Sequence, residues 1–175
     1  MTIIFLINDQ SFSLAKRLAG RHRNPATAKN NKNRKMILII RISGQVDVPG
    51  KIEEALYKLK LRRKYASVLI NPSPEKLKLL KKIRDYIAYG NINKETLKKL
   101  IEKRAEFKGA KKNIDAEKII LELEKNSLEK LGLKPFFRLH PPRGGIDSKK
   151  HFGTSKKAVL GDNREKINDL VRRML

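Results

Sequence analysis

The stretch Met36-Ile37-Leu38-Ile39-Ile40-Arg41-Ile42 decides the fold class of this chain. It is short, apolar and rich in β-branched residues, as is typical of a central β-strand. A second run of this kind, Ser67-Val68-Leu69-Ile70-Asn71, follows after a helical pattern. Residues 86–92 could form a third strand, in which Gly90 would let the chain turn. Together these runs predict a small β-sheet.

The helices between the strands are marked by their start signals. Val48-Pro49 leads into the first helix, and Ser73-Pro74-Glu75 supplies an N-cap, a first-turn proline and a dipole-matched acid for the second. The residues expected to face inward are Ile52, Ala55, Leu56 and Leu59 in the first helix and Leu77, Leu80 and Ile83 in the second. The order β-α-β-α-β predicts an α+β fold, a small sheet with helices on one face.

Three further helices are predicted after the third strand. One starts at Asn93, one at Asp115, and a last one follows a capping box made by Asp162 and Glu165. Their expected apolar positions are Leu97, Leu100 and Ile101, then Ile119, Ile120 and Leu123, then Ile167, Leu170, Val171 and Met174. The three helices would add to the small sheet without forming a repeat.

The charge balance says more about partners than about fold. The 175 residues include 42 Lys and Arg but only 18 Asp and Glu, so the net charge is +24. A polyanion would relieve this self-repulsion, with nucleic acid the first choice and an anionic membrane surface the second. There are no cysteines, which excludes disulfides and thiolate metal sites. The apolar run Ile3–Ile7 is too short to span a membrane, and we expect a cytoplasmic protein.

Residues 1–35 differ from the rest of the chain: after Ile3–Ile7 they run through several basic residues into the tail of residues 24–35, which has no apolar period. Such a segment cannot offset its own ordering entropy. Two interpretations stay open. The segment is a basic, disordered arm that orders on RNA, or the start site is over-extended and translation begins at Met36; we favour the second.

A cationic loop near the C-terminus is the most informative functional feature. Residues 136–152, here called the Pro-Gly loop, contain Pro141-Pro142 and Gly144-Gly145, which predict an irregular backbone, neither helix nor strand. Positive charge on such a shaped surface favours a phosphate backbone as its target. The candidate RNA-binding residues of this region are Arg138, His140, Arg143, Gly144, Gly145, Lys149, Lys150 and His151, followed by Lys156 and Lys157.

A second cluster, Arg62-Arg63-Lys64-Tyr65, has no acid to balance it and offers a tyrosine ring for stacking on a base. The lysines of the predicted helices, such as Lys78, Lys81 and Lys82, allow two interpretations: RNA contacts or ordinary solvated helix faces. No helix carries Asn, Gln and Arg at a base-reading spacing. The chain therefore fits a protein that binds folded RNA by shape and backbone.

Enzyme chemistry finds little support. None of the three histidines pairs with a carboxylate at metal-ligand spacing, and the acids on the predicted helices have lysines nearby. We therefore expect no catalytic residues, no metal site and no cofactor. An RNA-processing enzyme would need a candidate acid or base pair, and a membrane-surface protein would need a bulky aromatic helix face. Neither is visible.

Several motifs in one order resemble the L thirty family of large-subunit ribosomal proteins, in its archaeal and eukaryotic branch, whose eukaryotic member is called L seven. The likeness covers Met36 to Leu175. It lies in the strand Met36–Ser43, in Val48-Pro49 and in the motifs Leu59–Asn71, Tyr86–Gly90, Phe137–Gly145, His151-Phe152-Gly153 and Leu160-Gly161. Two positions depart from the family pattern, Asn91 and Ile146.

The resemblance implies a ferredoxin-like α+β core, no catalysis and no cofactor. It implies a structural protein that binds 23S-type rRNA near the 5S rRNA and supports subunit assembly, beside neighbouring ribosomal proteins and not as an independent homo-oligomer. The expected division is a basic arm (1–35), a ferredoxin-like core (36–92), a helical insertion (93–133), and the basic loop with its C-terminal helix (134–175). The alternative is a non-ribosomal RNA-binding assembly factor with the same fold.

Overall fold

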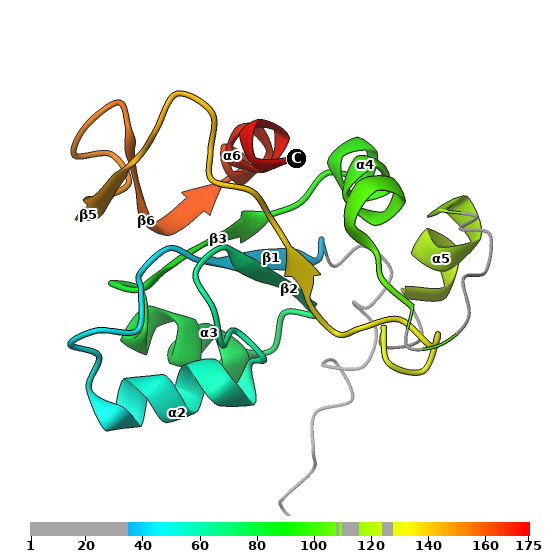
Figure 1. Cartoon of the computed structure of the whole chain (residues 1–175), viewed down its shortest axis with the longest axis horizontal. Helices are drawn as coiled ribbons and strands as arrows, with labels where there is room; N and C mark the ends of the chain where they lie inside the picture. Colours follow the sequence, from blue (N-terminus) through cyan, green and yellow to red (C-terminus); the bar gives the residue numbers. More distant parts are fainter. Residues whose placement is uncertain (1–34, 108, 110–115, 124–127) are drawn as a thin grey trace, which may run out of the picture. The chain divides into compact units, whose positions relative to one another are not determined.

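The computed structural model describes residues 35–107, 109, 116–123 and 128–175. The elements, in chain order, are β1 (Ile37–Arg41), α2 (Gly50–Lys58), β2 (Ala66–Ile70), α3 (Pro74–Lys82), β3 (Ile87–Asn91), α4 (Lys94–Arg104), α5 (Ala116–Leu123), β4 (Phe137–Arg138), β5 (Asp147–His151), β6 (Ala158–Arg164) and α6 (Ile167–Met174) (Figure 1). The predicted α+β class is confirmed, and so is the order β-α-β-α-β at its start. The expectations for residues 1–34 and for a helix start at Asp115 lie outside the described residues.

The six strands form one sheet in the order β4-β2-β1-β3-β6-β5. The central strand β1 pairs antiparallel with β2, where Ile39 lies opposite Val68, and with β3, where Leu38 lies opposite Gly90. On the far side, β6 runs parallel to both β3 and β5. The sheet thus takes strands from residues 36–92 and from residues 134–175; the division into segments stays a prediction.

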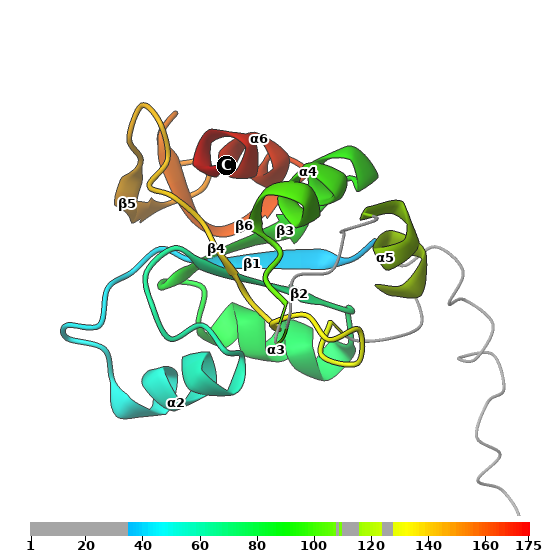
Figure 2. The ribbon, with the colours of Figure 1, turned by 45° about the vertical axis from the view of Figure 1, so that its right-hand side comes forward.

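Helices cover both faces of this sheet, so the expectation of helices on one face was wrong. Ile37 and Ile39 of β1 belong to a core cluster with Leu56 of α2 and Leu80 of α3. The alternate β1 residues pack into a second cluster that includes α4 and α6 residues. Figures 1 and 2 show α2 and α3 on one side of the sheet and α4 and α6 on the other. A strand buried on both faces is apolar throughout, which explains why β1 shows no alternation.

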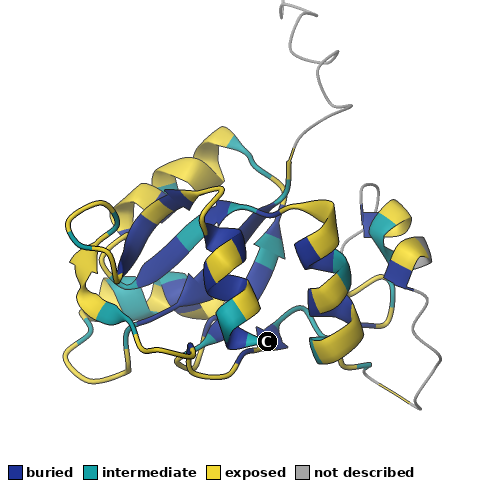
Figure 3. Cartoon of the chain, turned by 90° about the horizontal axis from the view of Figure 1, so that it is seen from above, coloured by how far each residue is buried: buried dark blue, intermediate teal, exposed yellow. Residues whose placement is uncertain are grey.

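The helix signals are mostly confirmed. Ser73 accepts a hydrogen bond from the Lys76 amide at 3.3 Å, as an N-cap should. The buried faces are as predicted for α4 and α6, whereas Leu77 of α3 is exposed and not inward. Figure 3 shows the exposed outer faces of the helices around the buried sheet.

The prediction that Asp162 and Glu165 form a capping box for the last helix was wrong. Asp162 lies in β6, and its carboxylate accepts from the Arg164 amide at 2.9 Å, so it caps a turn at the end of that strand. Helix α6 starts only at Ile167, and no side chain caps it. Its start is held instead by buried Asn168, which accepts from the Asn93 amide and donates to the Asn91 carbonyl.

Two further expectations need correction. Gly90 is not at a turn: a Cβ atom at this position would lie 2.2 Å from the Arg164 carbonyl oxygen, so glycine allows β6 to approach β3 closely. The Pro-Gly loop is not wholly irregular either, because it contains β4 and β5. Its middle is irregular as predicted, with Gly144 (φ 76°) and Gly145 (φ 68°) both in the left-handed region.

Candidate nucleic-acid interface

The α2–β2 loop, residues 59–65, presents the first predicted cluster. Arg62, Arg63 and Lys64 are exposed, and Tyr65 is half-buried with a positive φ of 63°. The Leu139 amide donates to the Tyr65 carbonyl at 3.1 Å, and β2 pairs with β4 so that Ala66 lies opposite Arg138. The sheet therefore brings Arg138 of the Pro-Gly loop beside the Arg62–Lys64 cluster, although about 75 residues separate them in the sequence.

A buried arginine of the central strand holds this loop in place. The guanidinium of Arg41 donates to the carbonyls of Leu61 (2.8 Å) and Arg62 (3.1 Å). It also donates to Ser43 and Gly44 on the other side of the same corner. Burial lowers the pKa of Arg41 from its usual value, with Glu53 and Tyr57 opposing that shift, but a guanidinium keeps its charge in proteins. The buried Arg41 side chain thus fixes the backbone of the α2–β2 loop, while the cationic side chains of this loop stay exposed.

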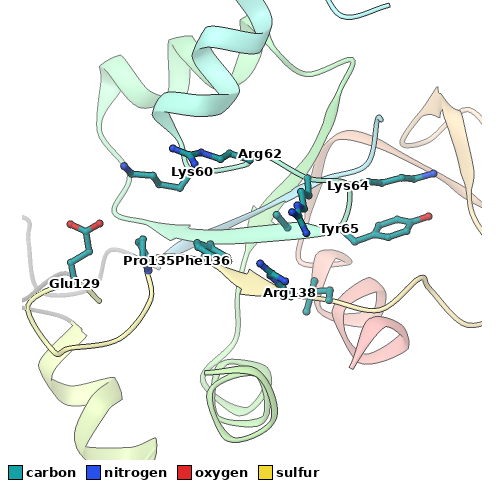
Figure 4. A pocket seen from close by; sticks show the side chains of 11 residues that line it. Lys60, Arg62, Lys64, Tyr65, Glu129, Pro135, Phe136 and Arg138 are labelled. Carbon is teal, nitrogen blue, oxygen red and sulfur yellow. The ribbon is translucent and has the colours of Figure 1, made fainter. Parts of the chain in front are cut away.

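The α2–β2 loop and the segment around β4 line a hollow of about 560 Å³. Its lining residues are Lys60, Arg62, Arg63, Lys64, Tyr65, Ala66, Glu129, Pro135, Phe136, Arg138 and Leu139. Five of these side chains are cationic and one is acidic. Figure 4 shows Pro135 and Phe136 between Lys60 and Arg62 on one side and Arg138 on the other.

Cations and rings are paired around this hollow. The Arg138 guanidinium lies 5.8 Å from the centre of the Phe136 ring, and the Lys64 ammonium lies 5.1 Å from that of Tyr65. Arg62 lies 5.5 Å from the ring of Tyr57 on α2. These distances are in the cation–π range, so the rings restrain long cationic side chains that would otherwise be free.

The Pro-Gly loop is held by the C-terminal helix. The amides of His140 and Arg143 donate to the carbonyls of Met174 and Arg173, each at 3.0 Å. In return, the Arg173 guanidinium donates to the Arg143 carbonyl at 2.9 Å and, over a short distance, to that of Gly145. The last carbonyls of α6 therefore find donors in the loop, and the loop gains a fixed path.

The other predicted residues lie farther along the loop. Lys149, Lys150 and His151 are on β5, Lys156 and Lys157 are in the turn before β6, and all five are exposed. Two of them have acidic neighbours: the Lys150 ammonium lies 3.5 Å from Asp147, and the His151 ring lies 3.0 Å from Asp85. These exposed pairs compete only weakly with an anionic ligand.

The structure thus gathers Arg62, Arg63, Lys64, Tyr65 and Arg138 at one hollow, and places the remaining predicted residues along the rest of the loop and the β5–β6 turn. The sequence reasoning missed Lys60, Pro135 and Phe136 as lining residues, and it missed Arg41 as a support. A signal for Arg41 was present: a single charge within an apolar strand must find partners when it is buried.

In the part of the chain that the structure describes, no group of three or more His, Cys, Asp or Glu side chains could hold a metal ion. Within the same residues, every helix is too short or too polar to span a bilayer.

Comparison with known proteins gives a consistent answer. Residues 37–87 match the family model described as ribosomal protein L30p/L7e. Large ribosomal subunit protein uL30 of Desulfurococcus amylolyticus is 40% identical over 162 residues, covering 81% of this chain and 99% of the relative. The proteins of the same name from Aeropyrum pernix and Archaeoglobus fulgidus are 37% and 36% identical, over 78% and 79% of this chain and 97% and 99% of theirs. The resemblance seen in the sequence is therefore confirmed, and the chain belongs to the L30p/L7e family of ribosomal proteins.

Proposed function

We propose that this chain is a structural constituent of the large ribosomal subunit and that it binds large-subunit rRNA. The proposal rests on membership of a family whose relatives are named large ribosomal subunit protein uL30. The observation that carries RNA binding is the joining of two separate basic segments into one surface, by the pairing of β2 with β4. Exposed cations held on a rigid sheet edge suit a folded polyanion.

The binding residues work in two ways. Exposed Lys and Arg side chains neutralise phosphates and release condensed counterions, so affinity falls steeply with added salt. The hydrogen bonds from Arg41 and Arg173 fix the backbone of both basic segments before RNA arrives, which reduces the ordering entropy lost on binding. Such contacts position a protein on RNA without reading its sequence.

The proposal also covers the compartment, the region of the rRNA and the neighbouring proteins. The protein would act in the cytoplasm without catalysis, contacting 23S-type rRNA in the region near the 5S rRNA, beside neighbouring large-subunit proteins. The positive charge of the chain supports a role inside a ribonucleoprotein and gives no reason to expect a homo-oligomer.

Sucrose-gradient sedimentation of the tagged native protein tests the proposal. We expect stoichiometric amounts in mature large subunits and in polysomes. Presence only in light precursor fractions would favour the assembly-factor alternative, and presence only at the top of the gradient would contradict both. Mass spectrometry of the N-terminus from the same fractions decides between a start at Met1 and a start at Met36.

A further inference from the structure

We infer that the hollow between the α2–β2 loop and β4 binds a single unstacked nucleotide of the RNA. This inference rests on the proposed function and deepens it, because it names a site for one nucleotide within a surface that otherwise contacts the RNA backbone. The residues that carry the argument are Phe136, Arg138 and the cations of the α2–β2 loop.

The charge of the lining favours an anionic ligand. Lys60, Arg62, Arg63, Lys64 and Arg138 face one acid, Glu129. The structure resolves no cross-hollow ion pair between Glu129 and these cations, among the residues that it describes. Charge-assisted hydrogen bonds from such a cluster suit the phosphate of a nucleotide.

The middle of the hollow has a different character. Pro135 and the half-buried ring of Phe136 form apolar lining between the cations, and the Arg138 guanidinium lies near the Phe136 ring (Figure 4). Rings and guanidinium planes are the groups on which unstacked bases stack in single-stranded RNA. A site with an apolar centre and cations around it matches a nucleotide, which joins a flat apolar base to a phosphate.

The dimensions agree with this assignment. A volume of about 560 Å³ lies within the usual range of small-molecule sites, roughly 300–1,000 Å³. A duplex cannot enter such a site, since its bases are stacked and paired. The ligand must therefore be a nucleotide from a bulge, a loop or a strand end.

Fluorescence of the full chain carrying Phe136→Trp tests the inference, because the chain has no tryptophan of its own. The probes are a blunt-ended RNA duplex and the same duplex with one bulged adenosine. We expect the bulged RNA to quench the F136W emission and to bind roughly tenfold tighter than the paired duplex. The wild-type chain should show the same preference.

Two matched variants separate stacking from folding. Phe136→Leu keeps apolar volume but removes the ring, and should abolish the preference for the bulged RNA. Tyr86→Leu removes another half-buried ring that packs against the same core cluster but does not line the hollow, and should keep the preference. Circular dichroism and thermal melts of both variants show whether each is folded.

The outcomes are distinct. If both RNAs bind equally, with steep salt dependence and no change in emission, the nucleotide site is wrong while the proposed function stands. If neither RNA binds, the nucleotide site is wrong, and the sedimentation experiment alone decides the proposed function. If hexaglutamate binds more tightly than the bulged RNA and quenches the same emission, the hollow belongs to an acidic protein segment, which also overturns the inference.

Discussion

The two basic regions of this molecule carry similar charge but are supported in different ways. The α2–β2 loop is fixed by one buried side chain, since Arg41 reaches the Leu61 and Arg62 carbonyls from the central strand. The Pro-Gly loop is fixed mainly by the end of α6, through backbone amides and the partly exposed Arg173. A rigid cationic loop can therefore be held in place either by a side chain of the core or by the end of a helix. The two supports should differ in how much of the fold depends on them.

The largest effect is expected from removing the core support. Arg41→Leu removes a donor from four carbonyls; that of Arg62 keeps a hydrogen bond from Gln45, and the other three lose their side-chain donor. Unsatisfied buried groups cost about 1–3 kcal/mol each. We expect the free energy of unfolding, measured in urea, to fall by about 3–5 kcal/mol after partial rehydration of the corner. The exposed neighbour variant Arg63→Gln should change it by less than about 0.5 kcal/mol. A small loss for Arg41→Leu would show that the corner does not depend on this side chain.

The next largest effect concerns β6, which pairs with β5 of the Pro-Gly loop and lies against β3. Gly90→Ala places a methyl group 2.2 Å from the Arg164 carbonyl oxygen, so β6 must move away from β3. Overpacking of this kind costs about 1–3 kcal/mol, and we expect the upper end because the obstacle is backbone. Urea unfolding checks the value.

Gly145→Ala is the control for this second prediction. Gly145, unlike Gly90, has a positive φ, and nothing lies within 4 Å of its added Cβ atom. Only the conformational cost remains, about 1–2 kcal/mol. An equal or larger loss for Gly145→Ala would contradict the idea that close approach of β6 is what requires glycine at position 90.

Removing the support that α6 gives to the Pro-Gly loop should have a smaller effect on stability but a clear effect on the mobility of that loop. Arg173→Gln removes the hydrogen bonds to the Arg143 and Gly145 carbonyls, which lie near the surface, and should cost about 1 kcal/mol. Faster amide hydrogen exchange at Gly144 and Gly145 should accompany it. Arg172→Gln, which loses only exposed contacts to Glu95 and Asp169, should leave exchange unchanged. Equal exchange in both variants would exclude Arg173 as a support.

The smallest effect concerns the segment that leads into β4. The hydrogen bond from Lys134, at 2.5 Å, and the lysine charge lower the pKa of Glu106. A depressed carboxyl pKa contributes stability above the unfolded pKa, and this contribution is lost as the pH falls through the folded pKa. Glu106→Gln should therefore lower the free energy of unfolding by less than about 0.5 kcal/mol at pH 7, since the pair is partly exposed.

Acid titration of stability provides the check on Glu106. The difference between wild type and Glu106→Gln should shrink as the pH falls below the usual glutamate pKa, about 4.3. A difference for Glu106→Gln that persists in acid would have to arise from something other than the ion pair.

Strong local patterns explain why much of the fold could be predicted from the sequence. Strands β1 and β2 lie in apolar runs, and Ser73-Pro74 marks the start of α3 by its own chemistry. Strand β5 reads Asp-Ser-Lys-Lys-His and has no apolar alternation, because it is an exposed edge strand that gains its form from pairing with β6. Long-range pairing of this kind leaves little trace in a short window of sequence.

The residue types of the candidate interface could be predicted from the sequence, but not that the fold brings its two segments together. Charge and the Pro-Gly composition pointed to Arg62–Lys64 and to Arg138–His151 as two separate basic segments. Their meeting at one hollow depends on β4, a strand of two residues that no periodicity could indicate. The role of each residue in RNA binding stays a prediction that binding measurements must test.

The most direct test of RNA binding by the Pro-Gly loop is the salt dependence of affinity for the large-subunit rRNA of the same organism. The full chain is compared with a variant in which Arg138, Arg143, Lys149 and Lys150 are alanine, and with a charge-matched variant in which Lys76, Lys78, Lys81 and Lys82 of α3 are alanine. We expect the slope of log affinity against log salt to lose about 3 in magnitude for the loop variant, at roughly 0.7–0.9 per phosphate contact, and clearly less for the α3 variant. An unchanged slope for the loop variant, or equal losses in both, would contradict the account.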